Sequence, residues 1–346
     1  MSSAAQIPRP SAANEPLLSL RGLSKQFPVK RDLFGRPQSW LSAVDDVDLD
    51  IYPGETVAVV GESGSGKSTL ARLVLRLIEP TSGSVVFDGT DVLKAAGSEL
   101  RDFRRSAQIV FQDPYGSLDP RMKVGKIIAE GMGHHAVGRE QRRLRLKELL
   151  ELVHLPERSL GLFPHEFSGG QRQRISLARA LAVEPRFLVA DEPVSALDVS
   201  VQSHMLNLLH DLQQRLELTY LFISHDMSVV RHVADRVAVM YLGKIVEFAP
   251  AEELFQNALH PYTQALLSSV PSLLREPGRA RITLEGDAPS PIDPPLACRF
   301  ASRCFRSLDV CRREPPALDR SNRGSDEHWV ACFNPVELEE VGVRGG

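Results

Sequence analysis

The chain lacks any long apolar run, which excludes a membrane-spanning helix. Its apolar stretches, such as residues 56–60 and 220–224, are short, whereas a helix that spans a bilayer needs roughly 20 consecutive apolar residues. Residues 1–15 contain Pro, Ser and Ala but no continuous apolar core, so they do not have the pattern of a secretory signal. We therefore expect a cytoplasmic protein that reaches a membrane only through a partner.

The sequence also lacks a basic excess and widely spread cysteines. Its 41 Lys and Arg residues against 44 Asp and Glu give a net charge of −3, so no nucleic-acid partner is expected for the chain as a whole. All four cysteines fall between Cys298 and Cys332, which argues against disulfides that support the main core. With 346 residues, the chain can form one principal core with an extension.

Apolar strands alternate with helical patterns, which predicts an α/β fold with a mainly parallel sheet and flanking helices. We expect strands at residues 17–20, 56–60, 84–87, 187–190 and 221–224, helices at 68–78, 138–153, 169–182 and 201–216, and a hairpin at 236–248. Residues 27–40 are polar and basic, and we interpret them as a loop. From about residue 271 the composition is rich in Pro and Arg, which indicates a linker.

A glycine-rich turn follows the strand at 56–60 and has the spacing of a phosphate-binding loop, with two glycines four apart and a Lys-Ser ending. Its amides and the next helix N-terminus can face phosphate oxygens, with Lys67 adding positive charge and Ser68 a hydroxyl for Mg²⁺. A turn that only joins two elements is the less favoured alternative. Phe27 is the candidate for stacking on adenine, with Trp40 as a rival and core packing as the alternative. The predicted ATP-binding residues are Phe27, Gly61, Glu62, Ser63, Gly64, Ser65, Gly66, Lys67, Ser68 and Thr69.

The strand at 187–190 ends in two carboxylates. Asp191 can lie beside a phosphate-bound cation, and Glu192 can polarise an attacking water as a general base. Two solvated acids at a strand end are the alternative. His225 and Gln112 also follow apolar strands, where they can contact the γ-phosphate, Mg²⁺ or the water. The predicted catalytic residues are Glu192, His225 and Gln112, and the predicted Mg²⁺ ligands are Ser68, Gln112 and Asp191.

Residues 167–174, which begin Phe-Ser-Gly-Gly-Gln, resemble the signature of the ABC ATPase family, although that family usually has Leu where this chain has Phe167. The resemblance covers roughly residues 17–265. It implies a P-loop ABC core with an N-terminal antiparallel β subdomain and a helical signature subdomain at about 113–182. It also implies head-to-tail pairing, in which the signature of one subunit binds the ATP held by the other. The signature residues are Ser168, Gly169, Gly170 and Gln171, and the dimer-loop residues are Ser195, Ala196, Leu197 and Asp198.

More narrowly, the chain resembles ATP-binding subunits of bacterial dipeptide and oligopeptide importers. The resemblance rests on the long segment 27–41, on residues 111–115 and on His260-Pro261-Tyr262-Thr263. It implies a heterodimer with a second ATPase, two permease subunits, an extracytoplasmic solute-binding protein, and a peripheral position on the cytoplasmic face of the bacterial inner membrane. Residues 115–122 would meet the permeases, with a plain surface loop as the alternative. Importers of nickel or glutathione remain alternatives, as does a soluble ABC ATPase that uses the basic residues 139–147 to contact nucleic acid or ribosomes.

The four cysteines form a separate feature in a tail at residues 266–346, after a flexible N-terminus at 1–16 and the ATPase domain at 17–265. Five, six and twenty residues separate Cys298, Cys304, Cys311 and Cys332, which is not the paired spacing of a zinc ribbon. The resembled importer subunits carry a four-iron cluster in a similar tail, which implies a [4Fe–4S] cluster on these four thiolates. Zn²⁺ on the same thiolates, and unligated thiols or disulfides, are the alternatives.

Overall fold

The structure is a computed structural model that describes residues 15–31, 37–132, 138–269, 282–286, 289–321, 325 and 327–336. The chain forms two compact units, which we describe separately. Unit 1 comprises Met1–Tyr52, Thr56–Leu93 and Ser224–Gly346, and unit 2 comprises Pro53–Glu55 and Lys94–Ile223. Most of the expected N-terminal segment and the start of the expected linker near residue 271 lie outside the described residues.

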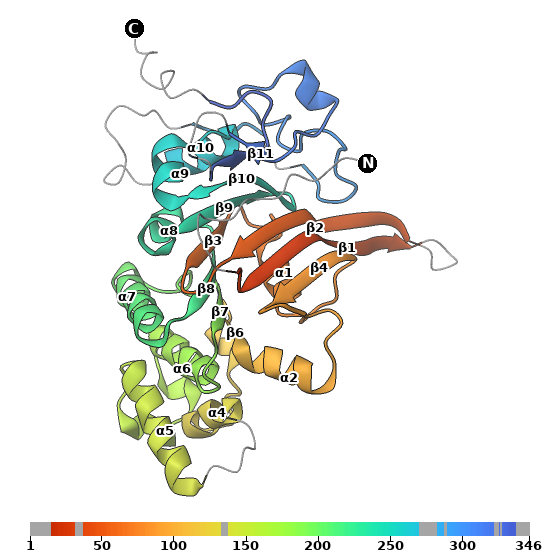
Figure 1. Cartoon of the computed structure of the whole chain (residues 1–346). Helices are drawn as coiled ribbons and strands as arrows, with labels where there is room; N and C mark the ends of the chain where they lie inside the picture. Colours follow the sequence, from red (N-terminus) through yellow and green to blue (C-terminus); the bar gives the residue numbers. More distant parts are fainter. Residues whose placement is uncertain are drawn as a thin grey trace. The chain divides into compact units, whose positions relative to one another are not determined.

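Unit 1 contains a four-stranded antiparallel sheet in the order β2-β1-β4-β5, with bounds β1 Leu18–Arg31, β2 Pro37–Ile51, β4 Ser82–Phe87 and β5 Thr90–Asp91 (Figure 1). The loop expected at residues 27–40 is wrong over its described parts, because residues 27–31 of β1 pair with residues 37–41 of β2, with Phe27 opposite Leu41. Residues 26–29 are all exposed, so this part of the strand buries neither face against a core. Pairing of its backbone with β2 defines it as a strand.

A second set of strands in unit 1 has the order β11-β12-β10-β9-β3. The fully buried β3 (Thr56–Val60) runs parallel to β9 (Arg236–Tyr241), and β9 forms an antiparallel hairpin with β10 (Lys244–Pro250). The expected strand at 56–60 and the expected hairpin are therefore confirmed. The remaining elements are α1 Lys67–Val74, α8 Met227–Val233, α9 Ala251–Asn257, α10 Pro261–Ser268, β11 Asp319–Arg320, β12 Trp329–Val330 and the 3-10 turn η4 Asp309–Arg312.

The helix expected at residues 68–78 is shorter than predicted. It ends at Val74, and Arg76 then takes a left-handed backbone with φ of 47°. That conformation is outside the helical region, so the apolar residues that follow cannot continue the helix.

Unit 2 contains three parallel strands in the order β8-β7-β6, with bounds β6 Ala107–Val110, β7 Phe187–Asp191 and β8 Thr219–Ser224. Its helices α4, α5 and α6 lie together at one end of the unit (Figure 1). Parallel pairing in both units confirms the α/β fold. The helices and 3-10 turns of unit 2 are α2 Gly97–Ser106, α3 Pro114–Ser117, α4 Val124–Gly131, α5 Arg139–Leu152, α6 Gly169–Leu181, α7 Val199–Leu216, η1 Glu157–Gly161 and η2 Pro164–Glu166. Within the described ranges, none of the helices has the length and apolar character needed to cross a membrane.

Candidate functional site

The phosphate loop lies in unit 1, between β3 and α1. Close packing requires glycine at two of its positions: a Cβ at Gly61 would lie 2.1 Å from the carbonyl oxygen of Met240, and a Cβ at Gly66 would lie 2.0 Å from that of Ala43. Gly66 also has a φ of 109°, which L side chains rarely adopt. The loop therefore needs glycine for two physical reasons, backbone angle and close approach.

Lys67 lies inside the loop and is 4% exposed. Its ammonium donates to the carbonyl oxygens of Gly61 and Glu62 at 2.8 and 2.9 Å. The loop thus places one positive charge at the N-terminus of α1, where backbone N–H groups also favour an anion. This arrangement can hold phosphate groups.

Residues outside the loop also hold it in place. The amide of Glu62 donates to the hydroxyl of Tyr262 at 2.8 Å, and the Glu62 carboxylate accepts from the guanidinium of Arg303 at 2.9 Å. At the other side of the loop, the amide of Gly243 donates to the carbonyl of Ser65 at 2.8 Å. The loop conformation is therefore supported by α10, by the β9–β10 turn and by the C-terminal tail.

The predicted carboxylates lie in unit 2 at the end of β7. Asp191 is 5% exposed, and the carboxylate of Glu192 accepts from the side-chain amide of Gln112 at 2.9 Å. The structure therefore brings Gln112 and Glu192 together, as expected for residues that end neighbouring parallel strands.

The Glu192 backbone is left-handed, with φ of 48°. Its amide donates to the carbonyl of Ile223 at 3.0 Å, and its carbonyl accepts from the hydroxyl of Ser195 at 3.1 Å. A non-glycine residue in this conformation costs energy and is found where neighbouring structure imposes it, often at functional sites. These contacts fix the direction of the carboxylate.

The signature residues form the start of α6. Ser168 is the N-cap, and its side chain accepts from the amide of Gln171 at 3.4 Å, while the side chain of Gln171 accepts from the amide of Ser168 at 3.0 Å. This reciprocal capping box explains the Ser-x-x-Gln spacing. It presents the start of a 13-residue helix, whose N-terminal amides favour anions.

The dimer-loop residues lie between β7 and α7. A Cβ at Gly169 would lie 3.7 Å from Cδ2 of Leu197, so this loop packs against the signature. Asp198 is the N-cap of α7, and the side chain of Gln202 donates to the carbonyl of Leu197 at 2.9 Å. The structure therefore brings the two motifs together within unit 2.

His225 and the two adenine candidates lie in unit 1, and all three side chains are exposed. Phe27 on β1 is 37% exposed, with the ammonium of Lys25 5.0 Å from its ring centre. Trp40 on β2 is 40% exposed, and its amide donates to Asp293 at 3.1 Å. Both aromatic rings are thus accessible to a ligand, and core packing is excluded for each.

The cysteine tail brings the four thiols into one neighbourhood without forming a metal site. Burial raises the pKa of Cys304 to about 11 and that of Cys332 to about 12, and the charges of Cys298 and Cys311 add to both increases. However, no group of three or more His, Cys, Asp or Glu side chains in the described part of the chain is arranged to hold a metal ion. The ligand set expected at Cys298, Cys304, Cys311 and Cys332 is not formed here. All four thiols are free, so the disulfide alternative is not borne out.

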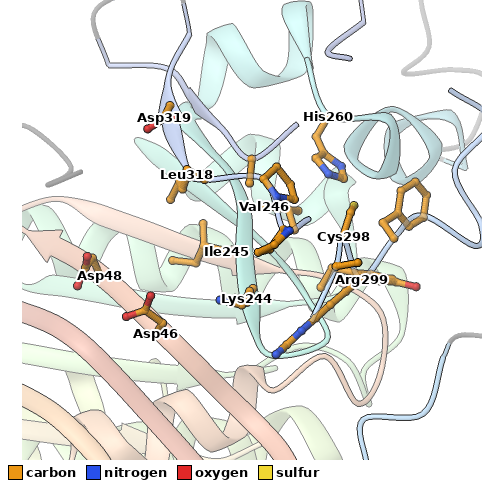
Figure 2. Close-up of a pocket in the computed structure, with 17 residues that line it drawn as sticks. Asp46, Asp48, Lys244, Ile245, Val246, His260, Cys298, Arg299, Leu318 and Asp319 are labelled. Atoms are coloured by element: carbon orange, nitrogen blue, oxygen red, sulfur yellow. The ribbon is translucent and has the colours of Figure 1, made fainter. Parts of the chain in front are cut away.

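A pocket of about 380 Å³ lies in unit 1 beside β10 and the cysteine tail (Figure 2). Asp46, Lys244, His260, Cys298 and Arg299 are among the residues that line it. Burial lowers the pKa of His260 to about 4, so this ring is neutral at neutral pH. The guanidinium of Arg299 donates to the carbonyl of Leu242 and forms an ion pair with Asp45.

The sequence did not single out Arg299, Arg303 or Gly243 as residues near the phosphate loop. Arg303 lies 241 positions from Glu62 in the sequence, and no spacing rule relates residues so far apart. The only available signal was that both arginines directly flank cysteines, at 298 and 304. Tertiary packing was needed to reveal this contact.

Comparisons with known proteins agree with these features. Residues 44–195 match the ABC transporter family, and residues 246–311 match the oligopeptide/dipeptide transporter C-terminal region. The oligopeptide transport ATP-binding protein AppF of Bacillus subtilis is 48% identical over 328 residues, which cover 93% of this chain and 98% of AppF. The di/tripeptide transport ATP-binding protein DppF of Pseudomonas aeruginosa is 47% identical over 325 residues, or 94% of this chain and 99% of DppF.

A solved structure supports the same assignment. The ATP-binding cassette MJ0796, described as a dimer in a post-hydrolysis state bound to ADP and Pi, has a TM-score of 0.60 and 30% sequence identity. The match covers 68% of this chain and 98% of the cassette. On these sequence and structural similarities, the chain belongs to the ABC transporter family of ATPases, and its C-terminal part is of the oligopeptide/dipeptide transporter type.

Proposed function

We propose that the chain is the ATP-hydrolysing subunit of a bacterial importer of dipeptides or oligopeptides. The observation that carries the enzymatic part is the carboxylate of Glu192, held at 2.9 Å by the amide of Gln112 on a fixed left-handed backbone. The matched C-terminal region and the peptide-transport names of AppF and DppF support the choice of cargo.

In the proposed mechanism, the loop amides and Lys67 bind the phosphates of ATP. Glu192 takes a proton from the attacking water, Gln112 and His225 orient the water and the γ-phosphate, and Phe27 stacks on adenine, with Trp40 as the alternative. The residues that would hold Mg²⁺ are Ser68 through its hydroxyl, Gln112 through its amide oxygen and Asp191 through its carboxylate, because this ion prefers oxygen ligands. Bound there, Mg²⁺ would neutralise charge on the phosphates.

We further propose that two ATPase subunits pair head to tail. In this arrangement, residues 168–171 of each subunit bind the γ-phosphate held by the phosphate loop of the other, and residues 195–198 lie at the interface. Binding of ATP closes the pair, and loss of the γ-phosphate contacts opens it. The proposed pair is a heterodimer on the cytoplasmic face of the inner membrane, joined to two permeases and supplied by a solute-binding protein.

The alternative use of α5 as a nucleic-acid surface has less support. Arg145 forms ion pairs with Glu148 at 3.2 Å and Glu184 at 3.1 Å, and Arg143 lies 4.0 Å from Glu157. These acids offset the charge of two of the five basic residues at 139–147, which reduces the positive charge available to a phosphate backbone. Recovery of the tagged chain with membrane permeases supports import, whereas recovery with DNA or ribosomes contradicts it.

The [4Fe–4S] cluster stays a prediction from resemblance, with Zn²⁺ as the alternative, and no step of the mechanism depends on it. Its donor chemistry is available, because four thiols lie in one tail, but their present arrangement does not form a ligand set. Iron, sulfide and zinc analysis of protein purified without oxygen distinguishes the two metals. Absence of all three would contradict both.

Replacing the proposed general base tests the enzymatic assignment. We expect Glu192→Gln to lower ATP hydrolysis by roughly 10²-fold or more, because the amide cannot accept the proton of water. Binding of ATP should persist and the nucleotide-bound pair should accumulate, which sedimentation and gel filtration with ATP would detect. Lys67→Ala is the matched control, since it should abolish both binding and pairing. Unchanged turnover of Glu192→Gln would contradict the role of this carboxylate.

A further inference from the structure

The phosphate loop is held from outside by a segment of the C-terminal tail. Arg303 reaches the loop directly, with its Nη1 2.9 Å from the carboxylate of Glu62 and 3.4 Å from the hydroxyl of Tyr241. The Arg303 side chain is 10% exposed and the Glu62 side chain is 33% exposed. Because one partner is largely buried, solvent screens this pair less than it screens a fully exposed surface salt bridge.

Arg299 supports the opposite end of the loop indirectly, through the β9–β10 turn. Its guanidinium donates to the carbonyl of Leu242 and to Asp45, and so holds the β9–β10 turn. The amide of Gly243 in that turn donates to the carbonyl of Ser65 at 2.8 Å. Figure 2 shows Arg299 next to Cys298 and near Lys244, which also pairs with Asp45 at 3.5 Å.

Aromatic packing anchors this tail segment. Phe300, which lies between the two arginines in sequence, is 1% exposed and packs against Tyr241 and Tyr262 with ring centres 5.2 and 5.4 Å apart. Tyr262 in turn accepts from the amide of Glu62. The amide and the carboxylate of Glu62 therefore both form hydrogen bonds to residues of this tail-anchoring cluster, the amide to Tyr262 and the carboxylate to Arg303.

We infer that Arg303 is a positioning residue for ATP binding, which acts through Glu62 to hold the phosphate loop in its binding conformation, with Arg299 supporting Ser65 through the β9–β10 turn. The inference rests on the proposed role of the loop in ATP binding. In this inference, the cysteine-bearing tail contributes to ATP binding by holding the phosphate loop.

The physical basis is preorganisation. A ligand that binds only the ordered loop has an apparent dissociation constant equal to the intrinsic value divided by the fraction of molecules with an ordered loop. Loss of the Arg303 contact should lower that fraction and weaken binding, while the groups that carry out hydrolysis, once ATP is bound, are unchanged. The effect should therefore be on KM for ATP and much less on kcat.

The test uses the full-length chain and two measurements: the dissociation constant of the non-hydrolysable ATP analogue AMP-PNP with Mg²⁺, and the KM and kcat of ATP hydrolysis. We expect Arg303→Ala to raise the dissociation constant and KM by about fivefold, which corresponds to an ordered fraction of roughly 0.2, with kcat changed less than about twofold. Arg303→Lys should restore part of the affinity, because it keeps the charge beside Glu62.

A double-mutant cycle tests whether Arg303→Ala acts through its contact with Glu62 or through a general loss of structure in the tail. Glu62→Gln removes the charge that Arg303 pairs with, so Arg303→Ala added to Glu62→Gln should have little further effect. Arg306→Ala is the matched control, because Arg306 lies in the same tail but donates to Asn334 at 3.3 Å. Its affinity for AMP-PNP should equal that of the wild type.

Three outcomes would overturn the inference: unchanged affinity in Arg303→Ala, additive effects in the cycle, or equal losses in Arg303→Ala and Arg306→Ala. Lys67→Ala distinguishes failure of the inference about Arg303 from failure of the proposed role of the loop in ATP binding. If Lys67→Ala loses AMP-PNP binding while Arg303→Ala keeps it, the loop assignment stands and only the role of Arg303 fails. If Lys67→Ala binds normally, the loop assignment itself fails.

Discussion

At the scale of single residues, Gly66 and Glu192 both have a left-handed backbone, but for different physical reasons. Gly66 has no Cβ because the carbonyl of Ala43 occupies that position. Glu192 keeps its side chain in a left-handed conformation, which hydrogen bonds to Ile223 and Ser195 hold in place. Both residues have a positive φ, which Gly66 adopts without strain and which neighbouring contacts impose on Glu192.

Two glycines of the phosphate loop make a matched pair of substitutions. Gly66→Ala should lower the free energy of unfolding by about 3 kcal/mol and greatly weaken ATP binding, because the new Cβ meets the Ala43 carbonyl at a strained φ. Gly64→Ala introduces only the strain of a φ of 80°, with no atom within 4 Å of the new Cβ, and should cost about 1 kcal/mol. Chemical denaturation measures both. Equal costs would contradict the packing argument.

At the scale of elements, the start of α6 is shaped by its neighbour α7. A Cβ at Gly170 would lie 2.5 Å from Cγ1 of Val201 on α7, whereas one at Gly169 would make an ordinary contact of 3.7 Å with Leu197. The signature therefore contains one glycine that close helix packing requires and one that it does not. The capping box of Ser168 and Gln171 then fixes where the helix begins.

This difference predicts a rescue. Gly170→Ala should destabilise the protein by about 1–3 kcal/mol through overpacking, and adding Val201→Ala should return stability close to that of the wild type, because it removes the clashing methyl group. Gly169→Ala should leave the melting temperature nearly unchanged. Thermal denaturation of the four proteins checks the prediction, and a double variant as unstable as Gly170→Ala would show that the steric account is wrong.

At the scale of the whole molecule, the C-terminal tail packs against the rest of unit 1 through buried polar contacts as well as through Phe300. His328 is fully buried, and its ring nitrogens lie 2.8 Å from Glu247 and 2.9 Å from Glu253. Burial by itself lowers the pKa of His328. The two glutamates raise it through hydrogen bonds and through their negative charges, and their effect outweighs that of burial. The folded protein therefore favours the charged ring.

This attachment predicts a pH dependence. Because the pKa of His328 is raised on folding, its contribution is fully present below the ordinary value of 6.5 and is lost as pH rises through the folded pKa. His328→Gln should lower the free energy of unfolding by about 3 kcal/mol at pH 6, and its deficit relative to the wild type should narrow toward pH 9. The exposed His210 supplies the control, because His210→Gln should leave the free energy of unfolding unchanged at both pH 6 and pH 9. If the loss of stability in His328→Gln grew with pH, the direction of the predicted pH dependence would be wrong.

Several features followed from local sequence because their causes are local. The glycine spacing around Lys67 predicted the phosphate loop, the apolar run before Asp191 predicted β7, and the Ser-x-x-Gln pattern is the capping box at the start of α6. The pairing of residues 27–31 with residues 37–41 was missed, because residues 26–29 are exposed and pack no side chain into a core. The domain boundary at residue 265 and the roles of the site residues stay predictions.

The sequence by itself determined the family and the order of its motifs, because glycine spacing, strand-end carboxylates and helix caps depend on residues close together in the chain. Only the tertiary structure decided what holds those motifs in place. It joined Gln112 to Glu192, 80 positions apart, and Glu62 to Arg303, 241 positions apart. Side-chain contacts over such separations depend on how strands and loops pack, and no sequence period encodes them. The tail that carries the cysteines thereby contacts the phosphate loop through Arg303.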